Sequence, residues 1–147
     1  MNGEQFTRKI DEILRRLDAL EATAHINYSK GTYSPTYLGG TTAGATTYSV
    51  QQGTWIRIGN VIIVTGNVTW TAVTGTGNAQ ISLPFTPSAR GAGALWIQNV
   101  TFANSTPTIQ IASQAFFLMY SPLTNAAGAI VQMEAAGDVR FTLVILA

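Results

Sequence analysis

The chain has 147 residues, enough for one helix and one domain of roughly 100–150 residues. Its formal net charge is +1, and the basic residues outside the N-terminal region are isolated, so no positive stripe for nucleic-acid phosphates exists. The absence of cysteine excludes disulfides and suits synthesis in a reducing cytoplasm. The N-terminus lacks the apolar core of a signal peptide, and no run approaches the ~18 apolar residues of a membrane helix. We expect neither nucleic-acid binding nor membrane insertion.

An amphipathic helix is predicted over residues 1–25, because apolar residues recur there at alternating spacings of four and three. The heptad assignment places Ile10, Leu17 and Ala24 at a positions and Phe6, Ile13 and Leu20 at d positions. A helix buries such a stripe against copies of itself, and isoleucine at both a and d favours three strands over two. The prediction is a trimeric coiled coil, with these trimerisation residues: Phe6, Ile10, Ile13, Leu17 and Leu20. The chain would then be a homotrimer. At roughly 20 residues the helix is marginal alone, so the remaining chain must share the work of trimerising.

Charge marks the boundary of the next domain. Of the 15 Asp, Glu, Lys and Arg residues, nine lie within Glu4–Glu21. We expect a polar linker over residues 26–31 and a β domain over residues 32–147, which is rich in Thr, Gly, Asn and β-branched residues.

The clearest strand signal is a hairpin. Residues 46–52 and 55–58 alternate in polarity, Gly59-Asn60 has the composition of a two-residue turn, and Val61–Val73 is a long β-branched run. In that run the even positions around Ile62 are apolar, whereas the odd positions are mixed: Ile63, Thr65, Asn67 and Thr69. The mixed face predicts partial cover by another chain or layer, and Gly66 predicts a bulge.

Further short strands are expected on both sides of this hairpin. Residues 32–38 form an extended segment that Pro35 restricts to a sheet edge. The later candidates are residues 79–83, 94–103, 108–112, 116–120, 129–134 and 139–146, the last of them apolar enough for a central strand. Many short strands between turn signals predict a mainly β fold, an antiparallel jelly-roll-like sandwich that follows the coiled-coil helix.

The strings QGTWIRIGNVIIVTGNVTW and GTGNAQISLPF, which begin at Gln52 and Gly75, resemble the trimeric β-sandwich knobs at the tips of tailed-bacteriophage fibres, tailspikes and minor structural proteins. The resemblance extends loosely to the C-terminal strand. It implies a homotrimer that binds surfaces, and it implies no chemistry.

Two virion roles follow from this resemblance. The starting Met and the lack of a long shaft favour a capsid decoration (cement) protein, seated on the outer capsid surface and bound to the major capsid protein. The alternative is the receptor-binding distal domain of a tail fibre or tailspike that recognises a host surface polysaccharide.

The sequence contains few side chains that could act in catalysis. His25 is the only histidine and sits at the helix exit, where a polar residue needs no functional explanation. The predicted β domain holds two carboxylates, Glu134 and Asp138, which we expect to be solvated or paired with arginine, although glycoside hydrolysis by such a pair is the alternative. No His/Cys cluster or Asp-rich loop is present. We expect no enzyme, no cofactor and no metal site.

Aromatic residues are the remaining candidates for ligand contact, because aromatic rings stack on sugars. Most of them alternate along strands, so burial in the core or in a subunit interface is expected. Tyr33, Tyr37 and Tyr48 flank flexible loops and are the candidate surface or glycan contacts.

Overall fold

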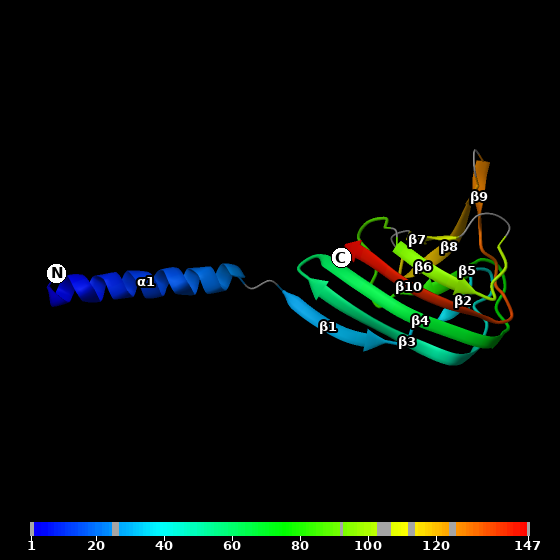
Figure 1. Cartoon of the computed structure of the whole chain (residues 1–147), viewed down its shortest axis with the longest axis horizontal. Coiled ribbons are helices and arrows are strands. Elements are labelled where there is room, and N and C mark those ends of the chain that lie inside the picture. Colours follow the sequence, from blue (N-terminus) through cyan, green and yellow to red (C-terminus); the bar gives the residue numbers. More distant parts are fainter. Residues whose placement is uncertain are drawn as a thin grey trace.

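The computed structural model describes residues 2–24, 27–91, 93–102, 107–111, 114–123 and 126–146. One helix precedes the strands (Figure 1). The elements are α1 (Gly3–Ala24), β1 (Tyr28–Tyr33), β2 (Tyr37–Gly39), β3 (Thr46–Ile58), β4 (Val61–Val73), β5 (Ala79–Ser82), β6 (Gly93–Gln98), β7 (Thr108–Ile111), β8 (Phe116–Leu123), β9 (Ala126–Ile130) and β10 (Gly137–Leu146).

The helix begins with a capping box. The Asn2 side chain accepts a hydrogen bond from the Gln5 N–H (3.0 Å), and the Gln5 side chain accepts one from the Asn2 N–H (3.3 Å). Glu4 in the first turn adds a negative charge at the positive end of the helix dipole. The helix projects from the β domain (Figure 1), and residues 2–21 are all exposed. The predicted helix is confirmed, while its coiled-coil partners stay a prediction.

The strands form two antiparallel sheets. The first, sheet A, has the order β1-β3-β4-β10-β6, and the second, sheet B, has the order β2-β5-β8-β7 with β9 paired to β8. Between β4 and β7 each connection passes from one sheet to the other. The mainly β, antiparallel prediction is confirmed, and β10 is a central strand, as its apolar sequence predicted.

The predicted hairpin is also confirmed, because β3 pairs with β4 along their whole lengths. Gly59 has a φ of +59°, and a positive φ at the first turn position suits the type II′ turn that matches strand twist. The predicted bulge at Gly66 is wrong: the register shifts lie between Thr47 and Val50, and Gly66 pairs directly with Gly53. Glycine is needed at position 66 because a Cβ there would overlap the ring of Phe141.

The predicted linker is wrong for residues 28–31, which belong to β1 and pair with β3. The exit from the helix is tied to the hairpin, because the Gly59 N–H donates to the Asn27 carbonyl (2.9 Å). The segment 32–38 is not one strand: Pro35 separates β1 in sheet A from β2 in sheet B. His25 lies outside the described residues, as do Ala103 and Ala112, the predicted ends of two strands.

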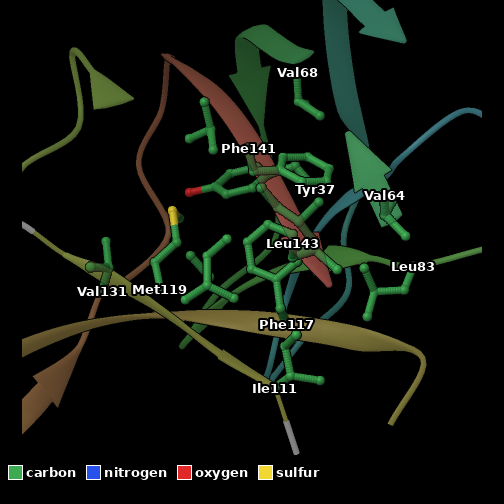
Figure 2. Packing of buried hydrophobic residues seen from close by; sticks show 14 of the residues in the cluster. Tyr37, Val64, Val68, Leu83, Ile111, Phe117, Met119, Val131, Phe141 and Leu143 are labelled. Carbon is green, nitrogen blue, oxygen red and sulfur yellow. The ribbon is translucent and has the colours of Figure 1, made fainter. Parts of the chain in front are cut away.

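The core lies between the inner faces of the two sheets. Figure 2 shows residues from both sheets in contact, and the T-shaped pair Phe117–Phe141, with ring centroids 4.8 Å apart, joins β8 to β10. Alternation places one side of β4 and β10 in this core, including Ile62, Val64 and Leu143. Every second residue of these strands therefore lies on the opposite, outer face of sheet A.

Candidate functional site: the outer face of sheet A

The outer face of sheet A is organised in rows that cross its strands. Cross-strand register aligns one outer residue from each strand. The row nearest α1 contains Tyr28, Ile58, Val61 and Leu146, and the second row contains Lys30, Ile56, Ile63 and Val144. These two rows lie where β3 ends, β4 begins and β10 ends, which is the end of the sheet that faces the helix (Figure 1).

Apart from Lys30, both rows are apolar and open to solvent. The exposed fractions are 58% for Tyr28, 45% for Ile58, 39% for Val61, 48% for Leu146, 38% for Ile56, 37% for Ile63 and 50% for Val144. We call these seven residues the apolar patch. Its one charged neighbour within the two rows is Lys30, on the edge strand β1. Contiguous exposed apolar side chains of this kind mark an interaction surface, whereas isolated ones are ordinary.

The third row is made of threonines. Thr32, Thr54, Thr65 and Thr142 align across four strands, with Ala94 on β6 beside them. The Thr54 and Thr65 hydroxyls hydrogen-bond to one another at 2.7 Å. These side chains are shorter than their neighbours, and shallow depressions of ≈ 470 Å³ and ≈ 280 Å³ lie along the row. The threonine row separates the apolar patch from a polar region.

The fourth row contains Gln52, Asn67, Arg140 and Trp96. The Trp96 side chain is 48% exposed, and the Arg140 guanidinium lies over its ring, 4.8 Å from the centroid. Arg140 also pairs with Asp138, two residues earlier on β10, at 3.4 Å. With increasing distance from the helix, the outer face therefore changes from apolar side chains to threonines and then to amide and charged side chains beside Trp96.

From Phe6 to Leu20 the predicted heptad stripe is exposed. Its residues show exposed fractions of 55% for Phe6, 40% for Ile10, 50% for Ile13, 48% for Leu17 and 67% for Leu20. Ala24 ends the helix, and its side chain lies outside the part that the structure describes. The chain thus presents two neighbouring apolar surfaces, the helix stripe and the apolar patch.

Tyr37, predicted as a surface contact, is completely buried and has no open ring face to offer a sugar. Its ring stacks on Trp70 with centroids 4.0 Å apart. The Tyr37 hydroxyl accepts a hydrogen bond from the Glu134 N–H (3.1 Å), and the Trp70 Nε1–H donates to the Glu134 carbonyl (2.8 Å). Burial raises the pKa of Tyr37 to about 12, opposed by the hydrogen bond from the Glu134 backbone and reinforced by the charge of Glu134. This pair of rings holds the segment before β10 and is structural.

Tyr48 and Tyr33 are half-buried. The Tyr48 hydroxyl accepts a hydrogen bond from the Tyr37 N–H (2.8 Å), so it too belongs to the internal network. The Tyr33 ring covers Gly53, and burial raises the pKa of its hydroxyl. Tyr33 also borders a depression of ≈ 530 Å³ at the β1 edge. Of the three candidate tyrosines, Tyr33 is the one that keeps the geometry of a ligand contact.

The two carboxylates of the β domain differ in their surroundings. Asp138 pairs with Arg140 through Oδ2, while its Oδ1 is buried without a hydrogen-bond partner; Glu134 is held through its backbone. Within the described ranges, no three His, Cys, Asp or Glu side chains gather in a way that could hold a metal ion. In the same ranges no helix is long and apolar enough to cross a membrane.

The apolar patch was missed from the sequence, except that Ile63 was placed on a mixed face. Its other residues come from β1, β3, the start of β4 and β10, and their adjacency depends on the strand order of sheet A. The signal that could have found it is the polarity of alternate positions at one end of each strand: Ile56 and Ile58, Val61 and Ile63, Val144 and Leu146.

Comparison with known proteins gives a likeness in fold. No protein-family model matches the sequence, and no curated protein does. Among solved structures, the Dettilon tailspike protein (gp208) superposes with a TM-score of 0.59 at 15% sequence identity, over 80% of this chain and 23% of the tailspike chain. The chain shares its fold with part of a tailspike. It spans about a quarter of that protein's length, and at this identity the likeness concerns the fold alone.

Proposed function

We propose that the chain is a structural component of a tailed-bacteriophage virion that acts as a homotrimer and presents a binding surface around a threefold axis. The observation that carries the proposal is the exposed heptad stripe of α1 joined to a β domain with the fold of part of a tailspike. Isoleucine at both a and d positions supports three helices in the bundle. Three copies of one weak contact then bind with a high effective concentration, without chemistry at any single site.

Within the virion, the receptor-binding distal part of a tail appendage is the role that we favour. The fold likeness is to a tailspike, and the chain corresponds to 23% of that protein, as expected of one module in such an appendage. Capsid decoration, with the major capsid protein as partner, is the alternative predicted from the sequence. It rested on the absence of a shaft, and the fold likeness adds no support to it.

Labelling of virions tests the location. A gold-conjugated antibody against the β domain, applied to purified particles of the phage that encodes the chain, should mark the tail tip in electron micrographs. Label spread over the capsid shell would replace the tail role with decoration. Absence of the protein from purified virions would remove the virion role altogether.

A host surface polysaccharide is the ligand class that the distal role implies. The purified protein should retard phage adsorption to host cells, and Tyr33→Ala should weaken this competition because Tyr33 borders the depression at the β1 edge. Thr47→Ala, an exposed change on β3, serves as the control. The protein should bind the polysaccharide without cleaving it. Release of reducing ends that disappears in Glu134→Gln would instead establish a hydrolase.

A further inference from the structure

We infer that the apolar patch of sheet A is a second self-association surface, through which three copies of the β domain pack around the axis that their helices define. The inference rests on the proposed homotrimer and extends it from the helix to the β domain. The partner of each patch is the same patch on the two other copies of this chain.

The connection between helix and sheet is too short to separate the two surfaces. The helix ends at Ala24 and β1 begins at Tyr28, four residues later. Four residues span at most about 14 Å, at roughly 3.3–3.6 Å each. The hydrogen bond from the Gly59 N–H to the Asn27 carbonyl also fixes the chain exit beside the hairpin turn. Three helices in one bundle therefore bring three copies of the first apolar row close together, at high effective concentration.

The chemistry of the patch suits contact between identical surfaces. Its seven side chains are uncharged and mostly β-branched or aliphatic, and Lys30 lies at the edge of the sheet, where it can stay in water. Three copies can bury the patch without burying a charge, which would otherwise carry a large desolvation cost.

The position of the patch indicates the same partner. Along β3, β4 and β10 the outer residues are apolar in the two rows at the helix end, threonine in the third row, and Gln, Asn and Arg in the fourth; the next outer residue of β3, Val50, is apolar but half-buried. Strand formation does not require this change, since the threonine row forms equally regular ladders. A contact localised next to the helix bundle accounts for it.

A different cover would be the chain's own helix folded back onto the patch. In the structure α1 points away from sheet A (Figure 1), and residues 2–21 are exposed. A folded-back helix would hide the heptad stripe and the patch from other copies. Cysteine cross-linking separates this arrangement from the trimer.

Cysteine cross-linking tests the inference in the full chain, because the natural sequence contains no cysteine. Single variants Ile63→Cys and Val144→Cys report on the patch, and Leu17→Cys reports on the helix stripe. Ser49→Cys, exposed at the far end of β3, is the matched control. After mild oxidation at micromolar concentration, the patch and stripe variants should give interchain dimers on non-reducing gels, whereas the control should stay monomeric on the gel.

The outcomes distinguish contact between the apolar patches from the homotrimer on which that contact depends. Cross-linking of Leu17→Cys without cross-linking at either patch position would overturn the patch contact and leave the trimer standing. Failure of all three variants would overturn the homotrimer itself. A fast-migrating, intrachain product in the double variant Leu17→Cys/Ile63→Cys, with no interchain product in the single variants, would establish the folded-back helix instead.

A second measurement covers the case in which a cysteine disturbs local packing. Ile63→Thr/Val144→Thr keeps β-branched side chains on the outer face, and Val50→Thr makes the same kind of change outside the patch. In sedimentation experiments over a dilution series, the patch variant should raise the concentration at which the trimer dissociates at least tenfold. The control should change it less than twofold. An unchanged midpoint in a patch variant with wild-type circular dichroism would overturn the inference.

Discussion

Replacement of Leu17 by aspartate is the sharpest test of assembly through the helix. Leu17 occupies an a position in the middle of the heptad stripe and is 48% exposed on the lone helix, next to Ile13 at 50% and Leu20 at 67%. In a three-helix bundle these side chains would be enclosed by the other copies. Aspartate at position 17 would place three carboxylates around the axis of the bundle.

The free energy that the trimer loses in Leu17→Asp follows from the part of the Leu17 side chain that is still exposed on the single helix. Complete burial of a leucine side chain is worth about 1.5–3 kcal/mol, and roughly half remains to be buried, so the loss is about 1 kcal/mol per copy. Enclosing a polar group without partners costs a further ~1 kcal/mol or more per copy. Over three copies the trimer loses about 6 kcal/mol, a factor of about 10⁴ in the association constant. Because the association constant of a trimer scales with the square of concentration, the protein concentration at which half of the trimer dissociates should rise about 100-fold.

Sedimentation velocity over a dilution series measures this shift. Ala19→Asp is the matched control, because it adds the same charge at a c position, away from the a and d stripe. The control should assemble like the natural chain. The reasoning would be refuted if Leu17→Asp and Ala19→Asp dissociated at the same concentration while both kept their helix by circular dichroism.

Three further predictions concern the β domain. Tyr37→Phe leaves the Glu134 N–H without its acceptor, so the free energy of unfolding, measured at fixed protomer concentration, should fall by about 1–3 kcal/mol. An unchanged melting temperature would contradict the role of this hydroxyl. Burial raises the pKa of Tyr37 to about 12, against about 10 in the unfolded chain. The stability that the protonated Tyr37 contributes to the folded state is therefore complete below pH 10 and is lost as pH rises toward 12. Urea unfolding from pH 9 to pH 12 should show stability falling, with a shallower fall in Tyr37→Phe; equal slopes would contradict the assignment. Gly66→Ala should destabilise the domain by about 1–3 kcal/mol, since its Cβ would overlap the Phe141 ring, whereas Gly3→Ala has open space and should not; equal effects in chemical denaturation would contradict this packing.

Local pattern was sufficient to predict the elements that depend on neighbouring residues. The helix, the hairpin around Gly59-Asn60 and the central position of the last strand all follow from periodicity and turn chemistry. The extent of β1 could not be predicted, because Tyr28–Gly31 is polar and is held by backbone pairing to β3. Such pairing requires a partner strand and little from the side chains.

Long-range pairing explains the errors at the candidate site as well. Tyr37 flanks glycine-rich sequence and resembles a loop residue, but its strand crosses into sheet B and turns the ring onto Trp70. The apolar patch depends on strand order, since residues 74–136 separate β10 from β4 in the sequence although the two strands pair in sheet A. A single-strand pattern shows which side chains share a face, whereas strand order decides which of them meet.

The helix stripe and the apolar patch are coupled by the short connection between them. A stripe of fewer than three heptads is marginal alone, and the patch on an isolated domain would have to hold three copies without prior alignment. When the helices align, the patches meet at high effective concentration, and patch contacts in turn hold the helix ends together. Loss of either surface should therefore remove most of the trimer. Adding Ile63→Thr/Val144→Thr to Leu17→Asp should then cost less than the sum of the separate effects, because the first change has already separated the copies. Additive costs in sedimentation equilibrium would mean that the two surfaces act independently.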